Sequence, residues 1–107
     1  MAVPTFAPEQ QAVAVVKAAE ARKARSELLA GVRVGRVAVA EVFARANEET
    51  VVSKTRVVQV LRAVPGYGPA KVAALMATCG VEVQRRVGDL GEAQRERLLI
   101  ALARELG

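Results

Sequence analysis

Two apolar helical segments are joined by the turn Val64-Pro65-Gly66-Tyr67-Gly68-Pro69-Ala70-Lys71-Val72. Pro65 fixes its own backbone, while the two glycines permit positive φ and leave no side chain between the backbone and a ligand. Pro69 suits the first turn of a new helix, whose early N–H groups lack intrahelical partners and whose dipole is positive. Exposed amides followed by Lys71 predict a site for an anion such as a phosphate. The alternative is an ordinary helical turn that ends in a glycine cap.

Hydrophobic residues on both sides of this turn recur with helical spacing, which predicts two core-facing stripes. The stripes comprise Val57, Val60, Leu61 and Val64 before the turn and Val72, Leu75, Met76 and Cys79 after it. Ser53 resembles the N-cap of the first helix, and Gly80 suits the C-terminal cap of the second. Cys79 is therefore expected in the core rather than as a reactive thiol.

The rest of the chain also predicts helices. A long one is expected from Glu9 to about Val34, because this stretch lacks proline and is rich in alanine. A short helix is expected between residues 35 and 49, a short helix or turn over 81–91, and a last helix over 92–106. The fold class is therefore all-α, in a single domain over 1–107. We divide it into a long basic N-terminal helix, 1–36, and a globular helical core, 37–107, which contains a helix-hairpin-helix-like element.

Positive charge predominates, with 16 Lys and Arg against 11 Asp and Glu and a formal net charge of +5. This excess favours an acidic partner, of which nucleic acid is the commonest, although a GC-rich coding sequence also raises the arginine content. Among these cations we single out three groups, Lys54 with Arg56, Arg85 with Arg86, and Arg22 with Lys23 and Arg25.

Each group of cations has a functional and a plain structural interpretation. On a helix, Arg85 and Arg86 would point about 100° apart and grip two phosphates. The alternative is a surface pair neutralised by Glu82 or Asp89. The N-terminal group is either a second DNA contact or a solvated helix face.

Several classes of site are disfavoured by what the chain contains. It has no histidine and one cysteine, so neither the usual zinc ligand sets nor an intramolecular disulfide is expected. We predict no metal, no cofactor and no catalytic residue, since Asp89 is the only aspartate and nothing indicates a pocket for an extruded base. The apolar stretches are interrupted by charges and the N-terminus does not resemble a signal peptide, which favours a cytoplasmic protein.

Several segments, in order and spacing, resemble the actinobacterial integration host factor family over nearly the whole chain. They are Met1-Ala2-Val3-Pro4, Pro8-Glu9-Gln10, Lys17 to Arg25, Ser53 to Val57, Leu61 to Val72, and Arg85-Arg86-Val87 with Leu90-Gly91. The resemblance implies an all-helical protein with a helix-two-turns-helix element similar to that of a ribosomal small-subunit protein. It also implies a nucleoid protein that binds duplex DNA with little sequence preference, bends or compacts it, and assists site-specific recombination.

By this resemblance the DNA-binding residues are Lys54, Arg56, Pro65, Gly66, Gly68, Lys71, Arg85 and Arg86. A phage or chromosomal integrase is a further expected partner, and the protein is expected to be a monomer. The chain departs from the family where Gly88 replaces a usual arginine and Asp89 replaces a usual glycine. An RNA- or ribosome-binding helical module stays open as the alternative function, with a DNA-repair lyase or glycosylase fragment as a remote one.

Overall fold

A computed structural model describes residues 8–106 and shows helices throughout, without a strand in that range. In chain order the elements are α1 (Pro8–Arg33), α2 (Val39–Arg45), α3 (Thr50–Lys54), α4 (Val57–Ala63), α5 (Pro69–Thr78), the 3-10 helix η1 (Val87–Asp89) and α6 (Glu92–Leu106). The predicted all-α fold class is confirmed.

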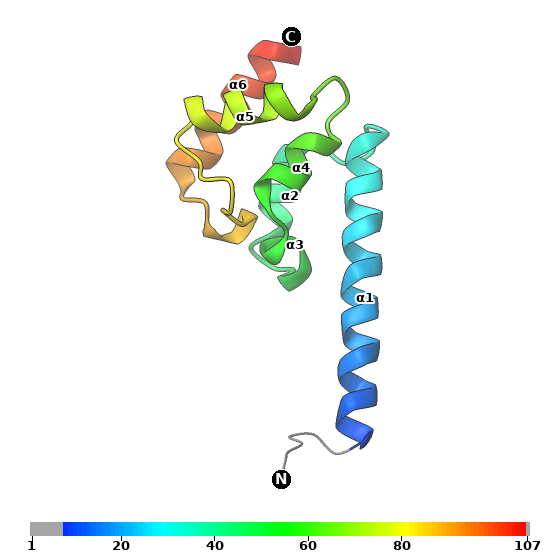
Figure 1. The fold of residues 1–107 in the computed structure, drawn as a ribbon. Helices are drawn as coiled ribbons and strands as arrows, with labels where there is room; N and C mark the ends of the chain where they lie inside the picture. Colours follow the sequence, from blue (N-terminus) through cyan, green and yellow to red (C-terminus); the bar gives the residue numbers. More distant parts are fainter. Residues whose placement is uncertain (1–7, 107) are drawn as a thin grey trace.

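Helix α1 stands along one side of the molecule, and its N-terminal half extends beyond the other helices (Figure 1). With 26 residues it is about 39 Å long. Leu28 and Val32 are buried in the C-terminal half, where α1 contacts α3 and α4, whereas residues 12–20 are all exposed. The expected long helix is therefore present, and residues 1–7 of the predicted N-terminal segment lie outside the described residues.

The core draws buried residues from all six α-helices and from η1, and both predicted stripes face it. The stripe residues Val57, Val60, Leu61, Val64, Val72, Leu75, Met76 and Cys79 are all buried. On α6, Leu98 and Leu102 are buried against them. Burial raises the pKa of the Cys79 thiol, as expected for a core cysteine. Gly80 ends α5 with φ of +70°, which confirms its capping role.

The predicted first helix of the turn element is divided in two, so the assignment of Ser53 as its N-cap was wrong. Ser53 lies inside α3, and α4 begins only at Val57. Between them, Thr55 and Arg56 are extended, with ψ of 138° and 141°. The buried Thr55 hydroxyl donates to the Val51 carbonyl at 2.8 Å, which ends α3 with a side-chain hydrogen bond.

The extended residues pair with a second segment far along the chain. Val57 N–H donates to Arg85 O at 3.0 Å, and Val87 N–H donates to Thr55 O at 2.9 Å. Arg56 and Arg86 thereby form an isolated antiparallel β-bridge. The interpretation of Arg85 and Arg86 as helical neighbours was therefore wrong, because η1 begins after them and Arg86 is extended, with ψ of 155°.

Among the described residues, no helix is both long and apolar enough to cross a lipid bilayer.

Candidate nucleic-acid interface

The turn between α4 and α5 exposes its glycines and buries its tyrosine. Gly66 has φ of +88°, a conformation that favours glycine. Gly68 has φ of −87°, so of the two glycines only Gly66 uses the positive φ that glycine permits. A Cβ at either glycine would meet nothing within 4 Å. The backbone at both positions therefore faces open space that a ligand can enter.

The hydrogen bonds that close the turn do not involve the N–H groups of Gly66 and Gly68. Tyr67 N–H donates to Val64 O at 3.1 Å and Val72 N–H donates to Gly68 O at 3.0 Å. Within residues 8–106, neither Gly66 nor Gly68 donates a backbone hydrogen bond. Pro69 occupies the first position of α5, where the following N–H groups have no intrahelical acceptor. The turn thus presents backbone donors on an exposed surface.

Tyr67 anchors the turn from beneath and orients its lysine. The Tyr67 side chain is buried, and Lys71 Nζ lies 4.7 Å from the centre of its ring. This cation–π contact holds the ammonium group close to the turn rather than letting it extend away. Charge and backbone donors therefore belong to one local unit.

The second cluster of cations lies at the opposite end of α4. Arg56 is the N-cap residue of α4, and the β-bridge brings Arg86 beside it. Lys54, the last residue of α3, is exposed two positions earlier. We call Lys54, Arg56 and Arg86 the bridge cluster. Among the described residues, none of the three forms an ion pair.

Arg85 does not join the bridge cluster, although it is next to Arg86 in sequence. Successive residues of an extended segment point to opposite faces, and Arg85 is partly buried while Arg86 is exposed. Its guanidinium Nη2 lies 3.6 Å from Glu82 Oε1. Part of the alternative interpretation, neutralisation by Glu82, therefore holds for Arg85.

Gly88 supports the bridge cluster by its small size. A Cβ at this position would lie 1.8 Å from Ser53 Oγ and 3.0 Å from Ser53 Cβ. An arginine, the usual family residue here, would collide with α3 unless Ser53 moved. Gly88 is thus a packing requirement of this chain as well as a lost charge, which the sequence alone did not indicate.

Arg95 is a structural residue that sequence reasoning missed. From α6, its Nη1 donates to the carbonyl of Phe43 at 3.2 Å and to Asn47 Oδ1 at 3.3 Å. Its Nη2 donates to the Val87 carbonyl at 3.5 Å. Arg95 therefore connects α6 to the end of α2 and to η1, directly beside the β-bridge. Arg97 of the same helix also donates to a carbonyl, that of Cys79 at 3.4 Å. Only the tertiary structure shows these contacts.

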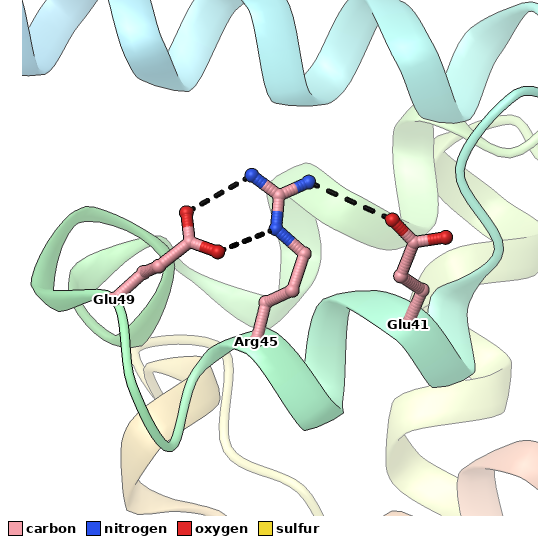
Figure 2. Close-up of polar contacts among 3 residues, drawn as sticks. All are labelled: Glu41, Arg45 and Glu49. Carbon is pink, nitrogen blue, oxygen red and sulfur yellow. Dashed lines mark hydrogen bonds and ion pairs between the residues drawn. The ribbon is translucent and has the colours of Figure 1, made fainter.

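Arg45 is also occupied within the protein. Figure 2 shows its guanidinium between two carboxylates, with Nε 2.8 Å from Glu49 Oε2 and Nη1 3.8 Å from Glu41 Oε2. The hydrogen bond with Glu49 is the main cause that raises the pKa of Arg45, and it lowers the pKa of Glu49. Arg45 is therefore a poor candidate for binding an external anion.

The three cations predicted on the N-terminal helix do not share one face. Arg22 and Lys23 are exposed, and neighbours on a helix diverge by about 100°. Arg25 is partly buried and follows the stripe of Leu28 and Val32 toward the body. A flat duplex surface on α1 could not engage all three together.

Helix α4 holds the turn and the bridge cluster at its two ends. Arg56 precedes its first residue and Val64 follows its last, a separation of about 12 Å along the axis. Since the charges of one DNA strand are spaced about 3.4 Å apart along the duplex axis, two sets separated by this distance are too far apart to share one phosphate. This arrangement suits the backbone of a nucleic acid better than a small anion.

Comparison with known proteins agrees with this geometry. Residues 32–102 match the S13-like H2TH domain. The chain is 35% identical to the integration host factor of Streptomyces coelicolor, over all of this chain and 96% of that protein. It is 36% identical to the integration host factor of Mycobacterium tuberculosis, over 92% of this chain and 94% of that one.

The chain belongs to the actinobacterial integration host factor family. A solved structure of a member, sIHF bound to an 8-base-pair palindromic DNA, superimposes with a TM-score of 0.75 at 32% identity. The match covers 85% of this chain and 98% of that one. The resemblance inferred from the sequence is thus confirmed, as is the helix-two-turns-helix element within an all-α fold.

Proposed function

We propose that this protein binds duplex DNA by its phosphate backbone and bends or compacts it. The observation that carries the proposal is that α4 presents exposed phosphate-binding groups at both ends, the turn at one and the bridge cluster at the other. Backbone amides and cations are the groups that contact DNA phosphates in most complexes. The relatives named integration host factor, and the DNA-bound structure of one member, support this assignment.

The proposed DNA contacts use the residues predicted from the sequence. The structure divides them between the two ends of α4 and separates strong from weak expected contributors. At one end of α4, Pro65, Gly66, Gly68 and Lys71 would hold one strand. At the other end, Lys54, Arg56 and Arg86 would hold a second part of the duplex. Arg85 would contribute less, because Glu82 already neutralises it in part. Arg22 and Lys23 on α1 would form a second DNA contact, with Arg25 in a lesser role.

Sequence specificity should be low, because these groups recognise phosphates and not base edges. Any preference would arise from how easily a sequence deforms. A second contact through α1 would let a monomer bend one duplex or bridge two, which is the property needed to organise a nucleoid. The same property would let the protein assist an integrase in site-specific recombination.

Fluorescence anisotropy with labelled duplexes of unrelated sequence tests the proposal directly. If about 5 phosphates are neutralised, log K should fall with log salt with a slope of roughly −4 to −5. End-labelled duplexes would report bending as increased energy transfer. Binding that ignored salt, or that required one particular sequence, would contradict the phosphate-backbone mechanism.

The second candidate is an RNA- or ribosome-binding role, which the S13-like description of the matching domain favours. A-form RNA has a deep, narrow major groove and a shallow minor groove, so phosphates across a groove are spaced differently. Competition between duplex RNA and duplex DNA at matched salt separates the two functions. A clear preference for RNA would replace the DNA proposal.

We further propose that the role is architectural and not enzymatic. Asp89, the sole aspartate, is exposed on η1. Incubation with abasic and uracil-containing duplexes tests this, with the Asp89→Asn variant as the comparison. Strand cleavage that this substitution abolished would make the protein an enzyme.

A further inference from the structure

The bridge cluster contains two arginines that the backbone forces together. The two hydrogen bonds on either side of Arg56 and Arg86 make them a non-hydrogen-bonded antiparallel pair. In such a pair the Cα atoms lie about 4.5 Å apart and both side chains leave from the same face. The two guanidinium groups therefore start from adjacent points on the surface.

Burial identifies which face this is. The neighbouring residues Thr55, Val57 and Val87 are 1%, 0% and 0% exposed, so they point into the core. Because side chains alternate along an extended segment, Arg56 and Arg86 point to solvent, and both are exposed. Neither side chain can avoid the other by turning into the protein.

The pair is electrostatically unfavourable as it stands. Arginine side chains are cationic, and like charges directly opposite each other on paired segments are destabilising. Neither arginine forms an ion pair with a described residue, whereas Arg45 and Arg85 do. Asp89, three residues after Arg86, places its backbone N–H on the Arg86 carbonyl at 3.0 Å but forms no ion pair with either arginine.

Contacts on the core side hold the pair in place against this repulsion. Gly88 packs on Ser53, the Thr55 hydroxyl donates to the Val51 carbonyl, and Arg95 donates to the Val87 carbonyl. The segments that carry the two arginines are thus fixed by contacts within the protein, independently of any ligand. Two fixed guanidinium groups whose N–H donors face solvent can together bind one tetrahedral anion.

We propose that Arg56 and Arg86 form a single anion site, in which both guanidinium groups bind the same phosphate. The identification of that phosphate as a DNA phosphodiester rests on the proposed function. The site itself requires only a phosphate oxyanion, and its existence can be tested without DNA.

The first experiment measures thermal unfolding with inorganic phosphate at constant ionic strength maintained with chloride. A ligand that binds the folded protein alone raises the midpoint as its concentration exceeds its Kd. Phosphate should raise the midpoint of the natural protein. Because the turn between α4 and α5 offers a second anion site, either Arg56→Gln or Arg86→Gln should reduce that rise to the part that the turn contributes. Arg33→Gln, an exposed arginine in the last turn of α1, is the matched control and should retain it.

The same variants also report the repulsion. Each substitution removes one of two positive charges that lie directly across the β-bridge from each other. Both variants should therefore be at least as stable as the natural protein at low salt without phosphate. Circular dichroism spectra confirm that they fold. A phosphate response as large in both variants as in the natural protein would overturn the proposed site.

The second experiment distinguishes one shared phosphate from two separate ones. With a shared phosphate, each single variant and the double variant should all weaken DNA binding by about tenfold, because the second loss removes nothing new. The slope of log K against log salt should become shallower by about 0.9 in all three. Two separate phosphates would give additive losses, about a hundredfold in the double variant, with a slope change of about 1.8.

Different outcomes of these experiments would contradict the proposed function and the shared anion site. Absence of DNA binding in the natural protein, with the phosphate response intact, would overturn the proposed function and keep the anion site. Normal DNA binding with additive losses, or with no phosphate response, would overturn the shared site and keep the proposed function.

Discussion

Two sites at the ends of α4 suit the same ligand, a phosphate, through different donor groups. One is the turn between α4 and α5, and the other is the bridge cluster at the start of α4. The turn lies within one short stretch, residues 64–72, and its donors are mainly backbone N–H groups. The bridge cluster joins two distant segments, and its donors are side chains on a β-bridge. One half of the interface is thus local and the other half depends on the fold.

This difference predicts which substitutions abolish phosphate binding at each of the two sites. Side-chain substitutions cannot remove the amides of the turn and can only block access to them. The bridge cluster is lost when either arginine is replaced, or when the packing beneath it is disturbed. Substitutions of single glycines separate the two cases, because glycines at the two sites serve different purposes.

The largest effect on stability is expected from Gly88→Ala, which disturbs the packing beneath the β-bridge. The added methyl group would collide with Ser53, and overpacking of this kind costs about 1–3 kcal/mol. Urea denaturation should show this loss of stability, and DNA binding should weaken because the β-bridge moves.

Two variants control this prediction. Gly91→Ala adds the same methyl group where nothing lies within 4 Å, and it should leave stability nearly unchanged. Adding Ser53→Gly to Gly88→Ala removes the obstructing side chain and should restore part of the loss. Unchanged stability in Gly88→Ala alone would show that α3 adapts freely and that the bridge is not tightly supported.

Gly66→Ala should have the next largest effect, this time on the turn. Gly66 has φ of +88°, and a residue with a Cβ in the left-handed region costs about 1–2 kcal/mol. Thermal or urea unfolding measures this cost. Gly66→Asn should lose less, because asparagine tolerates this conformation. Equal stability of Gly66→Ala and the natural protein would mean that the turn adopts another backbone conformation.

Gly68→Ala should leave stability unchanged and affect DNA binding alone. Its φ of −87° suits any residue and no atom lies near a Cβ at this position. A methyl group would occupy the space proposed for a phosphate, and a hydrogen bond to a charged group contributes about 1.5–3 kcal/mol. We expect Kd to rise by about tenfold in anisotropy measurements. Gly91→Ala, at the corresponding position before α6, should bind normally, and equal weakening in both variants would exclude a specific contact at Gly68.

The smallest effect is expected from Asp89→Asn, which removes a negative charge beside the bridge cluster. Exposed charges interact weakly in water, so we expect DNA binding to tighten by about two- to threefold at low salt. The gain should disappear at high salt, where exposed charges are screened. Glu48→Gln removes the same charge from an exposed position between α2 and α3 and should change little. An equal gain in both variants would indicate a general charge effect.

Local chemistry explains which sequence predictions were correct. The stripes of α4 and α5, the proline start of α5 and the Gly80 cap all depend on residues within a few positions of one another. Each was confirmed. Cys79 was likewise correctly placed in the core, because it continues the stripe of α5.

The incorrect predictions for Ser53 and for Arg85 with Arg86 share one cause, which is the pairing of residues 55–57 with 85–87. Ser53 has the chemistry of an N-cap, yet the hydrogen bonds of Val57 and Val87 draw the chain into an extended conformation two residues later. Arg85 and Arg86 were interpreted as helical neighbours, whereas the same pairing places them on opposite faces. Gly88 is a missing charge, as the sequence indicated, and its close approach to Ser53 is a further feature that the sequence did not indicate.

The amino-acid sequence by itself determined the all-α fold class, the family and the exposed glycine turn. The fold class and the turn follow from helical periodicity and from the conformational limits of proline and glycine, which act over a few residues. The family follows from the resemblance of several segments in order and spacing. Only the tertiary structure decided which cations meet at the other end of α4, because a β-bridge between distant segments leaves no periodic pattern in either one. It also assigned Arg45 and Arg95 to internal contacts, since a solvated arginine and an occupied one have the same side chain and differ only in what the fold places beside them.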